Sequence, residues 1–467
     1  MSSVGHVRRS FRLLPFRLRK RRKHKSIKDL PTELLIQIFL DCLSLKEFPR
    51  PSTREAPVSL TRVCRRWRSI ASSTPQLWAA ITSSRSQSEE RDVMALDVWI
   101  KRSGTCPLSV SLRHGVDYHC VAKCVQTILP YACRWKAVYL MASERCICLS
   151  QINKVLSTPD GTPLLEDFRA INVPGSTAFP GHVFPDLSAA PRPSTLHLGG
   201  DSIIHLIRPY STKFHAMREL RLHECENTVA CLHALNRCPS LEILEIALKN
   251  RSSSNVLTVP GPSEMHAIPL LHTLLVTGSL ENARPFIDHI RLPAVLRLSI
   301  FSTRAKSGYE SSMWPHVTNL IVRSGGNLEE LRIDGHIGRA GGFSKVLRCA
   351  NSLKSLSVGN PGYMLAHMNI LKPSLDMSYI LCPQLDRFEF LGAWNDMDIL
   401  GVADILVYRW RHSRNCGKRH SSPSTVMFEL KECVYTFQND FYISECVDEG
   451  MKVAELDCSD AWWLSNV

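Results

Sequence analysis

One short phrase recurs between about residue 164 and residue 390: a leucine, two or three polar residues, then leucine-x-leucine or leucine-x-isoleucine. Alternating leucines predict short strands, and helix-like stretches between copies, such as 229–237, 286–290 and 343–349, predict an α/β alternation. A strand this short cannot close a core alone, whereas stacked copies bury their leucines in one continuous ladder. The pattern therefore predicts a solenoid. The copies lie at Leu164–Ile171, Met217–Leu222, Cys238–Ile246, Pro269–Val276, Asn327–Ile333, Asn351–Val358 and Cys382–Phe390.

The spacing of these copies is irregular. With the strand leucine or its equivalent at 220, 244, 274, 296, 331, 356 and 388, the steps are 24, 30, 22, 35, 25 and 32 residues. Regular leucine-rich repeats advance by about 20–29 residues, so ordinary α/β packing is the alternative. The phrase nevertheless resembles a divergent leucine-rich repeat. The predicted fold class is α/β, with an N-terminal helical unit followed by an irregular leucine-rich-repeat-like solenoid.

Polar residues between the strand leucines would line the concave face, where such solenoids bind partners. By register, the candidates are Glu245, Arg332, Ser357 and Glu389. A slip of one residue would turn each of them inward.

Two amphipathic helices are predicted near the N-terminus. In the first, Pro31 and Glu33 suit a first helical turn, and apolar residues fall at 34, 35, 38, 39, 42 and 43. The second, over 60–71, places Leu60, Val63, Cys64, Trp67, Ile70 and Ala71 on one face, so Cys64 is interpreted as a packing residue. A unit of about 50 residues is marginal without a partner.

These phrases resemble an F-box: Leu-Pro-x-Glu-Leu-Leu-x-x-Ile-Phe over 30–39, Val-Cys-Arg-Arg-Trp-Arg over 63–68, and Pro-x-Leu-Trp over 75–78. The resemblance implies three helices that bind the Skp adaptor of SCF-type E3 ubiquitin ligases and, through it, a cullin–RING ligase. The link Ser44–Pro57 is longer than in compact F-boxes and ends in Glu-Ala-Pro, as in a long-link subgroup. It is interpreted as a tolerated loop. The residues expected to contact the adaptor, or to support that contact directly, are Leu30, Pro31, Leu34, Leu35, Ile38, Phe39, Val63, Trp67 and Ile70.

The chain is accordingly divided into a disordered basic tail (1–26), the F-box (27–82), a connector (83–160), a leucine-rich-repeat-like substrate-binding domain (161–430) and a C-terminal cap or tail (431–467). The runs 99–108 and 129–135 resemble the connector of the long-link subgroup. A helix over 398–410 and a last strand over 426–430 are expected, and Trp462 with Trp463 could cap the open end of the repeats.

Charge is concentrated at the N-terminus. Of the formal net charge of +14, the first 28 residues supply 11 Lys and Arg and no acid, which leaves +3 for the rest. A body that binds nucleic acid is therefore not implied. The tail fits a nuclear import signal, a phosphate-binding segment, a mimic of a mitochondrial presequence, or solvated chain without an address.

The apolar runs and the cysteines of the sequence bear on membrane insertion and on the compartment of the protein. No apolar run is long enough for a membrane span. The 17 cysteines occur without a secretory signal, which favours reduced thiols in the nucleus and/or cytoplasm.

Catalytic patterns are absent from the sequence. It contains no Walker loop, Gly-x-Gly-x-x-Gly, His-Glu-x-x-His or Gly-x-Ser-x-Gly. His119, Cys120, Cys124, Cys146 and Cys148 lack the usual spacing of a zinc site. We expect no catalytic residue, cofactor, metal or small-molecule substrate.

The expected function is that of a non-catalytic substrate receptor, which holds the Skp adaptor through the F-box and an unidentified target protein through the repeats. Ubiquitin transfer would then be promoted by proximity. One alternative is a nuclear scaffold or nucleic-acid-associated protein that acts through its basic tail. Another is an F-box protein that binds the adaptor outside a ligase.

Overall fold

A computed structural model describes residues 27–44, 47–83, 89–113, 122–142, 148–172, 187, 190–199, 214–225, 228–248, 265–302, 312–335, 341–359, 365, 367–372, 381–415 and 423–456. The predicted basic tail, the pair Trp462 and Trp463, and the possible zinc ligands His119, Cys120 and Cys146 lie outside these residues.

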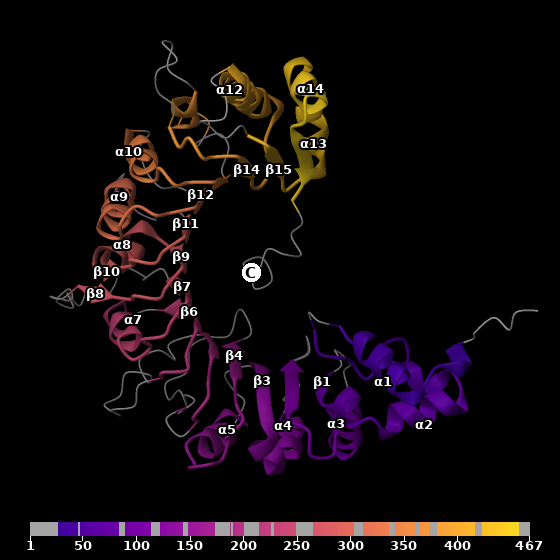
Figure 1. Ribbon diagram of the computed structural model, residues 1–467. Coiled ribbons are helices and arrows are strands. Elements are labelled where there is room, and N and C mark those ends of the chain that lie inside the picture. Colours follow the sequence, from indigo (N-terminus) through magenta and orange to yellow (C-terminus); the bar gives the residue numbers. More distant parts are fainter. Residues whose placement is uncertain are drawn as a thin grey trace, which may run out of the picture.

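The described chain contains one parallel sheet of 14 strands that follow one another in sequence order. The strands line the inside of an arc, and the helices lie on its outside (Figure 1). A separate pair of strands, β8 (His266–Ala267) and β10 (Ile290–Arg291), lies among the helices. The strands of the main sheet are β1 (Ala80–Thr82), β2 (Leu108–Arg113), β3 (Trp135–Ala142), β4 (Asp167–Asn172), β5 (Thr195–Gly199), β6 (Glu219–Cys225), β7 (Ile243–Leu248), β9 (Thr273–Gly278), β11 (Arg297–Ser302), β12 (Glu330–Gly335), β13 (Ser355–Val358), β14 (Arg387–Phe390), β15 (Thr425–Phe428) and β16 (Lys452–Glu455).

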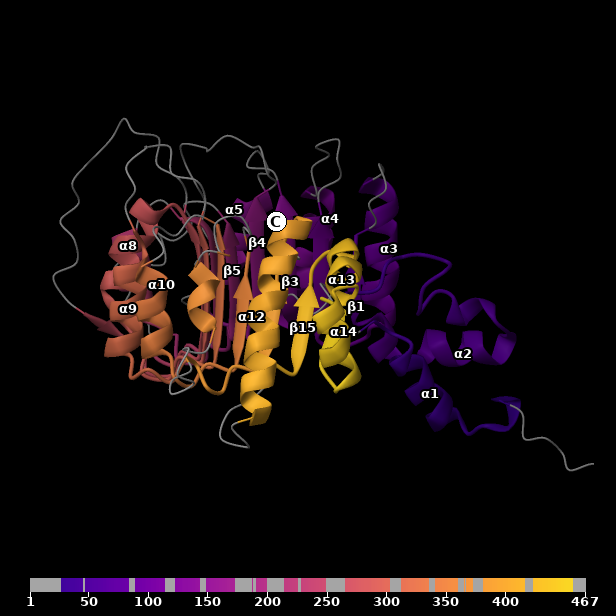
Figure 2. The ribbon, with the colours of Figure 1, turned by 90° about the horizontal axis from the view of Figure 1, so that it is seen from above.

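The helices fall into two groups. Those of the N-terminal unit project from one end of the arc, as the view from above shows (Figure 2). This unit comprises η1 (Ile27–Asp29), α1 (Thr32–Asp41), η2 (Leu60–Arg62), α2 (Arg65–Ser73) and η3 (Pro75–Trp78). The helices that accompany the sheet are α3 (Glu89–Arg102), α4 (Ala122–Ile128), η4 (Leu129–Arg134), α5 (Cys148–Leu156), α7 (Thr228–Leu235), α8 (Leu280–Asp288), α9 (Trp314–Arg323), α10 (Gly341–Cys349), η6 (Asn369–Leu371), α12 (Asp396–Asn415), α13 (Lys431–Gln438) and α14 (Phe441–Asp448).

Two rows of apolar side chains make the core of the sheet, the first running from β1 to β16 and the second from β2 to β15. Leu220, Leu244 and Leu274 are neighbours in the first row, and Leu222, Ile246 and Val276 are neighbours in the second. Each is at most 1% exposed. Because the strands from β2 to β15 carry apolar residues at both positions, stacking them buries a continuous ladder that a single copy could not bury. The architecture is compatible with an α/β solenoid.

One predicted ladder position is wrong. The residue of β11 that pairs with Leu274 and with Leu331 is Leu298, and Leu296 is 40% exposed. In neighbouring copies a buried apolar residue precedes the ladder by three positions, and in this copy that residue is Val295, which is 4% exposed. In this copy the alternation of leucines begins at Leu296, two residues before the ladder position. The sequence pattern therefore selected Leu296 instead of Leu298.

The sheet extends beyond the predicted repeat domain at both ends. Strands β1, β2 and β3 precede residue 161 and pair in register with the strands that follow. The segment interpreted as a connector therefore supplies strands of the same sheet. The strand expected to be the last, realised as β15, is followed by β16 beyond α13 and α14, so that expectation is wrong.

The N-terminal unit is joined to the sheet by two tryptophans. The rings of Trp78 and Trp99 lie edge to face with centroids 4.7 Å apart, and the Trp99 indole N–H donates to the carbonyl of Ala80 at 3.1 Å. The Trp78 indole N–H donates to the carbonyl of Ala71 in α2 at 2.7 Å. Since α2, η3, β1 and α3 are all held through this pair, the helical unit has a packed connection to the first strand.

Candidate interaction surfaces

The apolar residues predicted for the first helix form two rows on α1. Leu35 and Phe39 are completely buried, and Ile36 and Leu40 pack partly against the same core. Leu34 and Ile38, one turn apart, are 52% and 38% exposed. The helix therefore fills its own core with one row and presents a second to solvent.

The second predicted helix is interrupted at Cys64. Residues 60–62 form a 3₁₀ turn, and α2 begins only at Arg65. Cys64 has extended backbone (φ −158°, ψ 172°), and its sulfur accepts a hydrogen bond from the Trp67 backbone N–H at 3.4 Å. The thiol thus takes the place of a serine or threonine N-cap. The expectation that Cys64 packs on an apolar helix face is wrong, because the residue is exposed.

Burial divides the nine residues expected at the adaptor contact. Trp67 is half-buried, and its ring lies 4.8 Å from that of Phe39, which joins α2 to α1. Leu30 is also half-buried, and its carbonyl accepts from the Arg66 guanidinium at 2.6 Å. The buried members are Leu35, Phe39 and Ile70, and the exposed members are Pro31, Leu34, Ile38 and Val63, of which Val63 is 60% exposed. The three buried members cannot touch a partner unless the unit unfolds, whereas the exposed and half-buried members can.

The long link between α1 and η2 contacts the sheet. The Phe48 ring stacks on Tyr139 of β3, with centroids 4.8 Å apart and planes 17° apart. The carbonyl of Pro49 accepts from the Thr82 backbone N–H at 2.9 Å. The link was interpreted as a tolerated loop, and these contacts add a role: it ties the helical unit to the first strands of the arc.

A row of side chains that point away from the helices lies between the two buried rows, on the concave side of the sheet. It contains the four predicted candidates in equivalent positions, so their predicted register is confirmed. Each is nevertheless only 6–7% exposed. In strand order from β2 the row reads Ser111, Tyr139, Arg169, His197, Arg221, Glu245, Leu275, Ser299, Arg332, Ser357, Glu389 and Met427.

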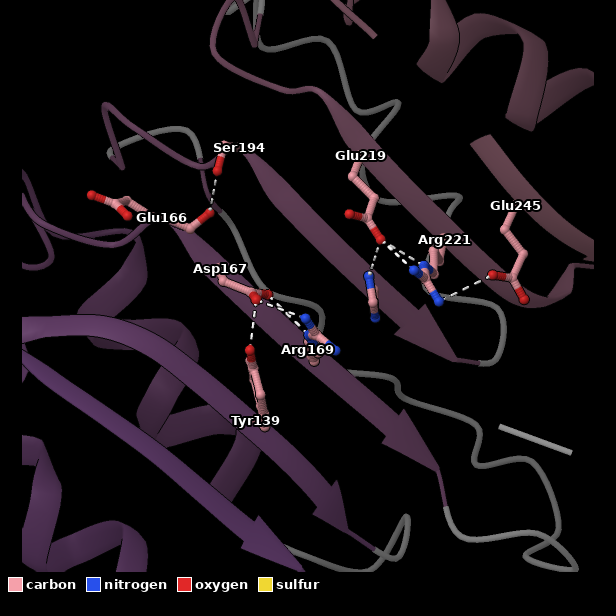
Figure 3. Close-up of polar contacts among 9 residues, drawn as sticks. Tyr139, Glu166, Asp167, Arg169, Ser194, Glu219, Arg221 and Glu245 are labelled. Atoms are coloured by element: carbon pink, nitrogen blue, oxygen red, sulfur yellow. Dashed lines mark hydrogen bonds and ion pairs between the residues drawn. The ribbon is translucent and has the colours of Figure 1, made fainter. Parts of the chain in front are cut away.

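Strands β3 to β7 carry a polar network that the sequence analysis missed (Figure 3). At one end the Tyr139 hydroxyl donates to Asp167 at 2.7 Å, and the Arg169 guanidinium pairs with the same carboxylate at 2.9 Å. The Arg169 guanidinium also lies over the Tyr139 ring, 4.2 Å from its centroid. Burial, with the negative charge of Asp167, raises the pKa of Tyr139 well above its usual range. The tyrosine is therefore a neutral donor.

At the other end the Glu219 carboxylate is shared by a histidine and an arginine. The His197 Nε2 lies 3.1 Å from Glu219, and the Arg221 guanidinium lies 2.6 Å from it. Burial raises the pKa of Glu219, but the His197 hydrogen bond and the Arg221 charge together outweigh burial and lower this pKa to about 2. Burial lowers the pKa of His197, which is 1% exposed. Glu219 is therefore ionised and His197 neutral at pH 7.

A signal for this network does exist in the sequence. An acid-x-arginine phrase stands at the same strand register three times, as Asp167–Arg169, Glu219–Arg221 and Glu330–Arg332. The first and last residues of each phrase project to the same face of a strand. Reading that repeat together with the leucine ladder would have located the pairs Asp167–Arg169 and Glu219–Arg221, whereas Glu330 pairs with Arg297 of the neighbouring strand.

No group of three or more His, Cys, Asp and Glu side chains in the described segments could hold a metal ion. Of the possible zinc ligands, Cys124 lies in α4 and is 1% exposed. Among the helices that the structure describes, none is long and apolar enough to cross a membrane.

Together these features define a small helical unit with an exposed apolar row, packed on the first strand of a long parallel α/β arc. Residues 27–84 match the F-box-like family model. The chain therefore contains an F-box-like domain, which includes the predicted boundaries 27–82. No curated protein matches the chain.

Proposed function

We propose that this chain is a substrate-receptor subunit of an SCF-type E3 ubiquitin ligase. The observation that carries the proposal is the exposed apolar row of the F-box-like domain, Leu34 and Ile38, on a helix whose opposite row already fills the core. An exposed apolar row that the core does not require is typical of a protein-docking surface. F-box domains typically bind the Skp adaptor, and we assign Leu34, Ile38 and Val63 to that contact.

In this proposal the arc is a divergent leucine-rich-repeat domain whose concave side binds a target protein. The two buried ladders and the row of side chains on the concave side support this reading, because such arrays use their concave surface for recognition. The chain itself would be non-catalytic and would act in the nucleus and/or cytoplasm. By holding adaptor and target on one scaffold, it would raise the effective concentration of a target lysine near a charged E2.

Titration of the full chain with purified Skp adaptor tests the docking surface. The variant Leu34→Asp/Ile38→Asp places two charges on the exposed row, and we expect adaptor affinity to fall about 30- to 900-fold, since loss of central apolar contacts costs about 2–4 kcal/mol. Because both side chains are exposed, stability to urea should remain close to that of the wild type.

A matched control also replaces two exposed apolar residues by aspartate, at the other end of the arc. Met397 and Leu400 of α12 are 76% and 46% exposed, and Met397→Asp/Leu400→Asp should leave adaptor affinity unchanged. A folded wild-type chain that does not bind the adaptor would refute the proposal. The nuclear scaffold driven by the basic tail would then lead, and it predicts phosphate-dependent binding that weakens steeply with salt.

A further inference from the structure

The last helix of the described arc, α14, exposes two aromatic rings that the core does not use. Ile443 and Cys446 of this helix are buried, whereas Phe441 and Tyr442 are 68% and 54% exposed and lie edge to face with centroids 5.5 Å apart. The terminal unit of a repeat array normally turns a polar face to solvent. Two exposed rings in contact with each other at this place therefore indicate a surface that another segment covers.

The face of α14 that carries Phe441 is acidic. Glu445 and Asp448 lie one and two helical turns beyond Phe441, both are exposed, and the helix contains no Lys or Arg. Glu445 pairs with Arg411 of α12 at 3.1 Å, whereas Asp448 has no cationic partner among the residues that the structure describes. An exposed ring beside a free carboxylate fits a Lys or Arg side chain, because the cation can lie against the ring and pair with the acid.

Charge complementarity indicates which segment covers this surface. Residues 429–456, which include α14, carry seven acidic and two basic side chains, a net charge of −5. The first 28 residues supply 11 Lys and Arg and no acid, and all the other residues together carry +8. The basic N-terminal segment is therefore attracted to the region around α14 and repelled, on average, by the rest of the chain. It also contains apolar side chains that match the exposed rings, namely Phe11, Leu13, Leu14 and Phe16.

The N-terminal segment is also long enough to reach α14. It joins the helical unit at one end of the arc, and α14 lies at the other end (Figure 1). The 14 strands are separated by 13 steps of about 4.8 Å, so the path along the sheet is about 62 Å. The direct distance between its ends is shorter, because the sheet curves back on itself (Figure 1). An extended segment of 26 residues covers up to about 90 Å.

We propose that residues 1–26 dock on the exposed face of α14 in the same chain. Basic side chains of this segment lie against Phe441 and Tyr442 and pair with Asp448, and its apolar side chains cover the rings. The contact joins the two ends of the arc across its open side. It goes beyond the proposed receptor function and does not depend on it, because no adaptor or target takes part.

The test places the photoreactive residue p-benzoylphenylalanine at position 441 of the full chain, without adaptor. After irradiation at 0.1 M salt, mass spectrometry should find this residue linked to peptides from residues 1–26 of the same chain. The yield should fall at least about fivefold at 1 M salt, because the screening length shortens from about 10 Å to about 3 Å. The control carries the same probe at Val322 of α9, which is 60% exposed, and should give no link to residues 1–26.

A change of charge tests the role of the free carboxylate. Asp448→Lys, combined with the probe at 441, should lower the yield of the link about three- to tenfold, since an exposed attraction becomes a repulsion. Glu330→Lys makes the same change of charge at an exposed acid of β12 and should leave the yield unaltered. Absence of links to residues 1–26, an equal yield from the probe at 322, or an unchanged yield in Asp448→Lys would overturn the proposal. Links between two chains that increase with protein concentration would also overturn it, in favour of docking between copies.

Discussion

At the scale of single residues, the most demanding buried charge is Arg409 of α12, which is 1% exposed. Its guanidinium donates to the backbone carbonyls of Leu371, Leu381 and Cys382, at 2.9–3.2 Å. Burial lowers its pKa to about 10, so it stays charged at neutral pH. Arg409 therefore joins the segment that ends at η6 to the segment that leads into β14, because its guanidinium binds carbonyls of both.

Arg409→Ala should therefore lower the free energy of unfolding by about 3–5 kcal/mol, because it removes three buried hydrogen bonds and leaves a cavity. The measurement is urea unfolding followed by circular dichroism. Arg414→Ala is the control: that side chain is 52% exposed and pairs with Glu449 at the surface, where such a pair contributes about 0–1 kcal/mol. Equal effects of the two changes would contradict the assignment.

A second residue-scale prediction concerns acid stability. Burial, together with the charges of His197 and Arg221, lowers the pKa of His223 from 6.5 to about 4. The unfolded chain binds the proton more readily, so stability is full above about pH 6.5 and is lost as the pH falls toward 4. The lowering corresponds to about 3 kcal/mol at most.

We expect His223→Gln to flatten the decrease in unfolding free energy between pH 6.5 and 4, compared with the wild type. Equilibrium urea unfolding at a series of pH values measures it. Curves that fall in parallel would show that His223 is not held neutral by its surroundings. The variant leaves the Glu219 contacts in place, and the pKa of Glu219 near 2 affects stability only below about pH 4.5.

At the scale of elements, periodicity predicted which segments form strands and helices but not where each begins. The helix expected over 398–410 is confirmed as α12, which is longer at both ends. The stop at Cys64 could not be read from periodicity, because the apolar spacing continues across it while the cap bond forms through the thiol. Sequence likewise could not divide the apolar residues of α1, since both rows are apolar and only packing in the folded unit, such as that of Phe39 on Trp67, separates them.

The link between α1 and η2 gives the element-scale prediction. Phe48→Ala removes its stacking on Tyr139, and such an aromatic pair contributes about 0.5–1.5 kcal/mol beyond the area that it buries. Local opening of the link should increase several-fold, and trypsin should cleave faster after the exposed Arg54. Adaptor affinity should not change.

A matched aromatic change serves as the control for this experiment. Phe441 of α14 is 68% exposed and packs edge to face on Tyr442 at the opposite end of the chain. Phe441→Ala should leave cleavage at Arg54 unaltered. If cleavage is equally fast in the wild type and in Phe48→Ala, then the link is not held by its contact with β3.

At the scale of the whole molecule, the predicted boundaries were less informative than the predicted repeat. The sheet begins at β1, inside the residues that match the F-box-like model, and continues without a break to β16. Sequence reasoning placed a connector at 83–160 because the runs 99–108 and 129–135 resemble the connector of the long-link subgroup. Val110, Val138 and Phe168 occupy the same ladder position as the leucines, and any buried apolar side chain of suitable size fills it.

The central claim is that the adaptor binds the exposed row of the F-box-like domain and leaves the arc free for a target. Hydrogen–deuterium exchange of the full chain, with and without the Skp adaptor, tests it most directly. We predict that the adaptor slows exchange in α1, around Leu34 and Ile38, and at Val63 beside α2. The peptides that cover β5 to β14 should exchange at the same rate in both samples. Protection centred on the concave strands, or no protection of α1 by an adaptor that binds, would contradict the account.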